Sequence, residues 1–207
     1  RILVPAAHLD ALANTLKSRL ANIIVGDPHE EGVRMGALSS RDQLRDVNHA
    51  IEQLLETSEC VFGRDGSFKP VGQGVENGAF ITPHLLINRN PLNDGGAHDI
   101  EAFGPVATLM PYSGIDEALT IAAKGKGSLV TTLTTKDPSI AAEMIPVLAA
   151  QHGRLQILDA QAAKESTGHG SPLPMLKHGG PGRAGGGEEL GGIRAVHHYL
   201  QRTAIQG

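Results

Sequence analysis

Short aliphatic runs alternate with helical segments along the middle of the chain, and this alternation constrains the fold more than any other feature. Apolar runs at 105–111, 129–134 and 154–158 are typical of strands, and segments 114–124 and 137–150 carry apolar residues at helical spacing. Strands joined through helices by short connections form right-handed βαβ units and a parallel sheet. The sequence therefore predicts an α/β fold. We expect 129–134 to be the most clearly buried strand, because four of its six residues are β-branched.

The first 90 residues add further elements to this sheet. An aliphatic strand at 2–4 precedes a helix over 6–22, and Ser40 can cap a second helix. A hairpin-like region at 58–88 is expected at the edge of the sheet. A last helix is expected over 190–200, and we assign residues 1–207 to one domain.

Composition limits the classes of protein. Hydrophobic residues make up 40% and charged residues 19% of the chain, and no apolar run approaches the roughly 20 residues of a membrane span. The net charge of -4 comes without a basic patch, so neither nucleic acid nor membrane is an expected partner. A single cysteine cannot form an internal disulfide, which favours a reducing, cytoplasmic compartment. The start at Arg1, without a Met, indicates a segment of a longer chain.

Histidines and the cysteine give weak signals for chemistry. The ten histidines include the adjacent pair His197 and His198, whose side chains diverge by about 100° on a helix, and we expect no metal site. Cys60 has acidic and apolar neighbours, which do not favour a thiolate. We interpret Cys60 as a packed or edge-strand cysteine.

Two segments of the sequence each allow two interpretations. Ten glycines lie between Gly168 and Gly192, either in a flexible loop that feeds a helix or in an ordered loop that lines a cleft. Glu101 and Phe103 stand two apart before a Gly-Pro turn. In an extended segment they share a side, where the carboxylate could bind a ribose diol and the ring could cover a flat heterocycle. The alternative is a solvated acid and a core phenylalanine.

Four motifs together carry a family resemblance. The segments 25–28, 78–83, 101–106 and 179–191, in this order and spacing, resemble motifs of the aldehyde dehydrogenase superfamily. The resemblance covers residue 1 to about residue 200. It implies a three-layer catalytic domain with a mostly parallel sheet, truncated at its N-terminal side. The family's nucleotide-binding domain, nucleophilic cysteine and general-base glutamate would lie upstream, so no catalytic residue is expected in this chain.

The resemblance also implies roles for individual residues. Glu101 would bind the ribose hydroxyls of a nicotinamide cofactor, NADP or NAD. Phe103 would flank the nicotinamide, and Gln43 falls at a weaker cofactor-contact position. His178 and Gly179 would border the aldehyde pocket.

Segments 178–191 and 198–207 resemble one subgroup of the family in particular. In that subgroup the dehydrogenase is joined to an enoyl-CoA-hydratase-like domain and oxidises a CoA-linked semialdehyde of phenylacetate degradation. A homo-oligomer is implied for the parent protein, and the isolated chain is expected to be inactive. The alternatives are an acyl-CoA or acyl-phosphate reductase on the same fold, or a non-catalytic, self-associating fragment.

Overall fold

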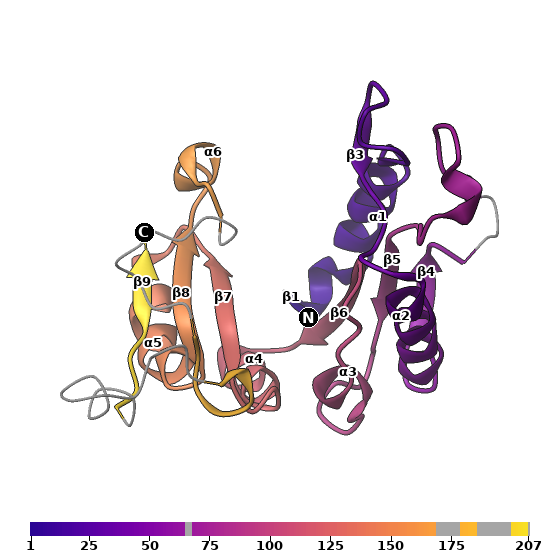
Figure 1. The fold of residues 1–207 in the computed structure, drawn as a ribbon. Coiled ribbons are helices and arrows are strands. Elements are labelled where there is room, and N and C mark those ends of the chain that lie inside the picture. Colours follow the sequence, from indigo (N-terminus) through magenta and orange to yellow (C-terminus); the bar gives the residue numbers. More distant parts are fainter. Residues whose placement is uncertain (65–67, 169–178, 186–199, 207) are drawn as a thin grey trace, which may run out of the picture. The chain divides into compact units, whose positions relative to one another are not determined.

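The structure is a computed structural model that describes residues 1–64, 68–168, 179–185 and 200–206 (Figure 1). Its contacts divide the chain into two compact units, Arg1–Gly114 (unit 1) and Ile115–Gly207 (unit 2). Each unit has its own sheet and is described by itself below. The assignment of residues 1–207 to one domain stays a prediction.

Unit 1 is built on a four-stranded sheet. Its strands, in spatial order, are β1 (Ile2–Pro5), β6 (Val106–Tyr112), β5 (His84–Ile87) and β4 (Glu59–Phe62). The first three strands are parallel, and β4 pairs antiparallel with β5. The predicted strand at 2–4 and the hairpin-like region at the sheet edge are thus confirmed. A separate parallel pair joins β2 (Ile24–Val25) to β3 (Val33–Met35).

Two long helices accompany this sheet. The short turn η1 (Ala6–His8) leads into α1 (Leu9–Leu20), which packs its apolar side on β1, β5 and β6. The helix α2 (Arg41–Leu54) begins where predicted, because the Ser40 hydroxyl accepts a hydrogen bond of 3.0 Å from the amide of Gln43. Two short elements complete the unit: η2 (Val75–Asn77) and α3 (Gly96–Asp99).

Unit 2 contains a three-stranded parallel sheet. Its strands, in spatial order, are β7 (Ser128–Thr134), β8 (His152–Leu158) and β9 (Ala204–Gln206). Its helical elements are α4 (Ile115–Ala123), α5 (Pro138–Ala149), α6 (Ala162–Glu165) and the turn η3 (Gly182–Ala184). The predicted α/β class with mostly parallel sheets is confirmed. The helix predicted over 190–200 lies outside the described residues, apart from Leu200.

The expectation that 129–134 is the most clearly buried strand is wrong. Leu129 in β7 is 48% exposed, whereas Leu155 at the centre of β8 is fully buried. The reason is position, because β7 lies at an edge of its sheet and β8 lies between two strands. β-Branched residues favour an extended backbone but do not decide which neighbours a strand acquires.

Candidate functional site

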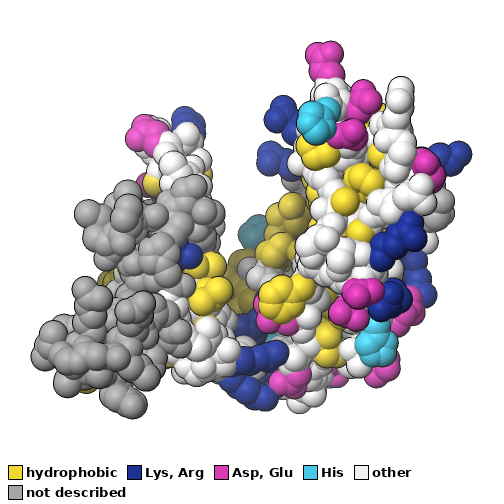
Figure 2. Space-filling model, in the orientation of Figure 1, with side chains coloured by type: hydrophobic (Ala, Val, Ile, Leu, Met, Phe, Trp, Pro, Cys, Tyr) yellow, Lys and Arg dark blue, Asp and Glu magenta, His cyan; other side chains and the backbone are white. Residues whose placement is uncertain are grey.

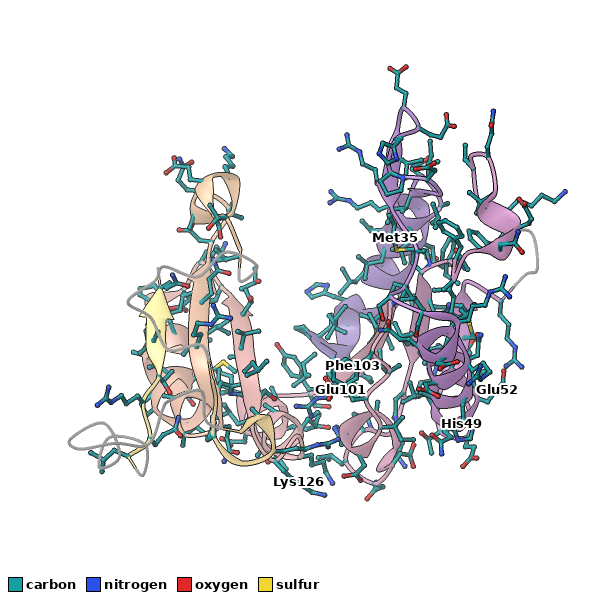
Figure 3. All side chains as sticks on the ribbon, viewed as in Figure 1. Met35, His49, Glu52, Glu101, Phe103 and Lys126 are labelled. Carbon is teal, nitrogen blue, oxygen red and sulfur yellow. The ribbon has the colours of Figure 1, made fainter. Side chains whose placement is uncertain are left out.

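The candidate site in unit 1 is the loop over residues 100–105, which connects α3 to β6 (the 100–105 loop). Glu101 is exposed, and the side chain of Phe103 is 72% exposed. Figure 3 shows the two residues next to each other on this loop. Phe103 is therefore not a core residue, while Glu101 is solvated, as that alternative also expected. A carboxylate and an open aromatic ring together offer hydrogen-bond acceptors and a flat apolar face.

The amide of Gln43 holds one end of this loop. Its Nε2 donates a hydrogen bond of 2.6 Å to the backbone carbonyl of Phe103. Its Oε1 accepts from the backbone amide of Ser39 at 3.0 Å and from the Ser39 hydroxyl at 2.5 Å. The structure therefore brings two of the predicted site residues together, and it does so through the backbone of Phe103.

Gly104 lies directly against the same helix. A Cβ atom at Gly104 would stand 2.8 and 2.9 Å from the two Cγ atoms of Val47, closer than real side-chain contacts allow. Val47 follows Gln43 by one helical turn, so the two side chains lie on the same side of α2. Only a glycine lets the loop approach α2 this closely.

The other end of the loop follows a buried histidine. His98 in α3 is 6% exposed, and its Nε2 lies 2.7 Å from the carbonyl of Pro91. Its Nδ1 lies 2.9 Å from Nη1 of Arg1. Because a carbonyl only accepts and a guanidinium only donates, Nε2 carries the proton and Nδ1 accepts from Arg1. Sequence reasoning missed this contact, since the two residues lie 97 positions apart.

The predicted aldehyde-pocket residues belong to unit 2. His178 lies outside the described residues. The carbonyl of Gly179 lies so close to Gly153 of β8 that a side chain at position 153 would collide with it. The turn that follows is held by a 2.9 Å hydrogen bond from the amide of Arg183 to the carbonyl of Lys126. Residues 179–185 of the glycine-rich segment thus pack on the amino ends of β7 and β8.

Cys60 lies in the edge strand β4, as the sequence predicts. It is half-buried, and its Sγ donates to the carbonyl of Phe62 at 3.2 Å.

Within the described ranges, no three His, Cys, Asp or Glu side chains form a group that could hold a metal ion. No helix in the described part of the chain is long and apolar enough to cross a bilayer. On the face of unit 1 seen in Figure 2, acidic and basic side chains are interspersed.

Comparison with known proteins identifies the class to which this fold and site belong. The model of the aldehyde dehydrogenase family matches residues 1–205, and the chain belongs to this family. Protein MaoC of Klebsiella aerogenes is 51% identical over 174 residues, which are 84% of this chain and 50% of that protein. The 3,4-dehydroadipyl-CoA semialdehyde dehydrogenase of Aromatoleum evansii is 40% identical over 181 residues, 87% of this chain and 35% of that enzyme.

Solved structures support the fold. A betaine aldehyde dehydrogenase from Staphylococcus aureus in complex with NAD+ matches 97% of this chain and 38% of its own chain, with a TM-score of 0.73 and 21% identity. An aldehyde dehydrogenase from Pseudomonas syringae in complex with NAD+ and octanal matches 96% of this chain and 37% of its own, with a TM-score of 0.69 and 24% identity. The chain thus spans half or less of the length of the proteins that it matches.

Proposed function

We propose that the 100–105 loop forms the nicotinamide-binding wall of an NAD(P)-dependent aldehyde dehydrogenase. The observation that carries this proposal is the pairing of an exposed carboxylate, Glu101, with an exposed ring, Phe103, on a loop braced by Gln43. Large aromatic side chains are usually buried, so an open phenylalanine on a braced loop favours a binding surface.

The residues present fit such a cofactor. The two oxygens of the Glu101 carboxylate can accept hydrogen bonds from two neighbouring hydroxyl groups, as on a ribose. The ring of Phe103 can lie against a flat heterocycle and exclude water from one of its faces. When bound, the cofactor accepts a hydride. Glu101 and Phe103 would orient and cover it, and Gln43 would contribute at the margin of the same surface.

The substrate proposed is an aldehyde, specifically a CoA-linked semialdehyde of an aromatic degradation pathway. The proposal is supported by the relative that acts as a CoA-semialdehyde dehydrogenase. His178 and Gly179 would border the aldehyde pocket. NADP as the preferred cofactor, a cytoplasmic location and a homo-oligomeric parent enzyme belong to the same proposal.

Covalent catalysis is not assigned to this chain. The family mechanism requires a nucleophilic thiol and a general base, and Cys60 is engaged within an edge strand. We expect no turnover when the 207-residue chain is mixed with NADP and a simple aldehyde. Turnover that disappears in Cys60→Ser would overturn this assignment.

The cofactor role is tested in a longer protein that carries this chain together with the remaining length of its relatives. We expect Glu101→Gln and Phe103→Ala to raise the KM for the cofactor or lower kcat by about tenfold to 100-fold, because misplaced reactants lose rate. Glu30→Gln, an exposed acid elsewhere in unit 1, is the matched control. Unchanged kinetics in Glu101→Gln would mean that Glu101 is only a solvated surface acid.

A further inference from the structure

We propose that Gln43 and His98 are positioning residues that fix the two ends of the 100–105 loop before any cofactor binds. The inference rests on the proposed function of Glu101 and Phe103. It goes further by assigning Gln43 a role through the protein backbone, and by assigning a role to His98. We call these two residues, with their hydrogen bonds, the loop clamp.

Gln43 acts through the carbonyl of Phe103. Its amide donates to that carbonyl and accepts twice from Ser39, so both ends of the amide are engaged within the protein. The Ser40 cap fixes the backbone of Gln43 itself. The Phe103 backbone is therefore joined to the first turn of α2, a rigid element, rather than left to a free loop.

His98 fixes the start of the same loop. Its buried ring donates to the carbonyl of Pro91 and accepts from the guanidinium of Arg1. Arg1 directly precedes β1, which pairs with β6, the strand that the loop enters. The start of the loop is thus connected by His98 to the same sheet that receives its end.

The clamp leaves Glu101 little freedom. Only four residues, 99–102, separate the two anchors at His98 and Phe103. A chain segment this short has few conformations compatible with both ends fixed. Gly104 adds to the restriction because it lies against Val47. A carboxylate that must meet two hydroxyl groups at once benefits from such a placement, since binding groups work best within about 0.5 Å of their productive geometry.

The first arm of the experiment uses the 207-residue chain without cofactor. Gln43→Glu keeps the length and the acceptor toward Ser39 but replaces the donor that faces the Phe103 carbonyl. The matched control is Gln53→Glu, an exposed glutamine of the same helix. We expect the NMR signals of Phe103 and Gly104 to shift, and amide exchange at 101–104 to speed up, in Gln43→Glu alone. Unchanged loop signals would overturn the clamp.

The second pair of variants addresses the histidine. His98→Leu removes both hydrogen bonds, and His98→Gln can retain the donor toward Pro91. His49→Gln is the control, since His49 is exposed on α2 (Figure 3). We expect loop signals to change most in His98→Leu and partly to recover in His98→Gln. If His98→Leu does not fold, Arg1→Met removes the contact from Arg1 to Nδ1, leaves His98 in place and is expected to shift the same signals. Loop signals that stay unchanged in His98→Leu, or in Arg1→Met when it takes its place, would overturn the role of His98.

The third arm measures cofactor KM and kcat in the longer protein. We expect Gln43→Glu and His98→Gln each to change the cofactor KM or kcat by about tenfold, with the aldehyde KM unchanged. If Gln43→Glu raises the cofactor KM while the loop signals of the free chain stay unchanged, Gln43 contacts the cofactor directly and its positioning role is overturned. The kinetics of the Glu101→Gln variant test the proposed function separately from the clamp. If it has no effect while the clamp variants shift the loop, the clamp stands and the proposed function fails.

Discussion

The central strands of the main sheets in the two units bury different kinds of side chain. In unit 1, the strand β5 is buried along its whole length, and Leu85, Leu86 and Ile87 are at most 3% exposed. In unit 2, the central strand β8 is also buried, but its buried side chains include the alternating polar residues His152, Arg154 and Gln156. Residues two apart in a strand share a face, so β8 carries three buried polar side chains in a row, whereas β5 carries one, His84.

The buried polar side chains of β8 differ in whether they have hydrogen-bond partners. His152 bonds through Nδ1 to the carbonyl of Leu148 at 2.7 Å, and Gln156 donates to the hydroxyl of Ser166. Among the described residues, Nε and Nη1 of Arg154 have no hydrogen-bond partner. A charged group buried without a partner costs free energy. The 100–105 loop therefore belongs to the unit whose central strand β5 is buried mainly through leucine and isoleucine, while the central strand β8 of the other unit buries an arginine with two nitrogens that have no partner among the described residues.

The largest expected effect compares one leucine from each sheet. Leu86→Ala removes a fully buried side chain of β5, and we expect it to lower the free energy of unfolding by about 2–5 kcal/mol. Leu129→Ala in β7, where the residue is 48% exposed, should cost less than about 1 kcal/mol. The chain has no tryptophan, so urea unfolding is followed by circular dichroism. Equal losses would contradict the difference in packing.

A second prediction concerns the contact between the loop and α2. Gly104→Ala places a methyl group against Val47, and we expect a loss of about 1–3 kcal/mol. Shortening the neighbour in the double variant Gly104→Ala, Val47→Ala should make the two losses non-additive, because the collision is removed. Gly114→Ala is the control, since a Cβ there meets nothing within 4 Å. Strict additivity in the double-mutant cycle would contradict the predicted contact.

The third prediction concerns unit 2, and it is a gain rather than a loss of stability. Arg154→Met replaces a buried cation, two of whose nitrogens have no hydrogen-bond partner among the described residues, by an apolar side chain, and we expect stability to rise by about 1 kcal/mol. The exposed Arg45, which pairs with Asp42 on α2, serves as the control in Arg45→Met and should change stability little. A clear loss of stability in Arg154→Met would show that Arg154 has a compensating partner.

The smallest effect is a pH dependence of unit 1. Burial, aided by the charge of Arg64, lowers the pKa of His84 below its ordinary value. In the unfolded chain the imidazole of His84 has a pKa of about 6.5. The unfolded chain therefore binds more protons than the folded chain as the pH falls through this value. Stability should be constant above about pH 7 and decrease toward about pH 5.5. Melting curves of the chain and of His84→Gln test this, and the variant should show a weaker dependence.

Local signals predicted the elements well. The Ser40 cap and the apolar periodicity after it placed α2 within a residue of its observed start, because caps and helical faces act within one or two turns. The position of β7 was predicted but not its exposure, since exposure depends on which strands pair beside it. The three-residue strand β9 was missed because it is too short to show a period.

The sequence named the members of the candidate site but not the contacts between them. The motif around Glu101 and Phe103 marked the loop, and the resemblance added Gln43. The hydrogen bond from Gln43 to Phe103 joins residues 60 positions apart, and that from Arg1 to His98 joins residues 97 apart. No local pattern encodes such pairs. They arise only when parallel strands and their crossover helices bring distant segments together.

The position of Cys60 has a practical consequence. It is the only thiol in the chain, and it lies half-buried in the antiparallel edge strand of unit 1. The rate at which a maleimide reagent modifies it therefore reports the accessibility of β4 in unit 1. Cys60 thus provides a built-in reporter for the unit that holds the 100–105 loop.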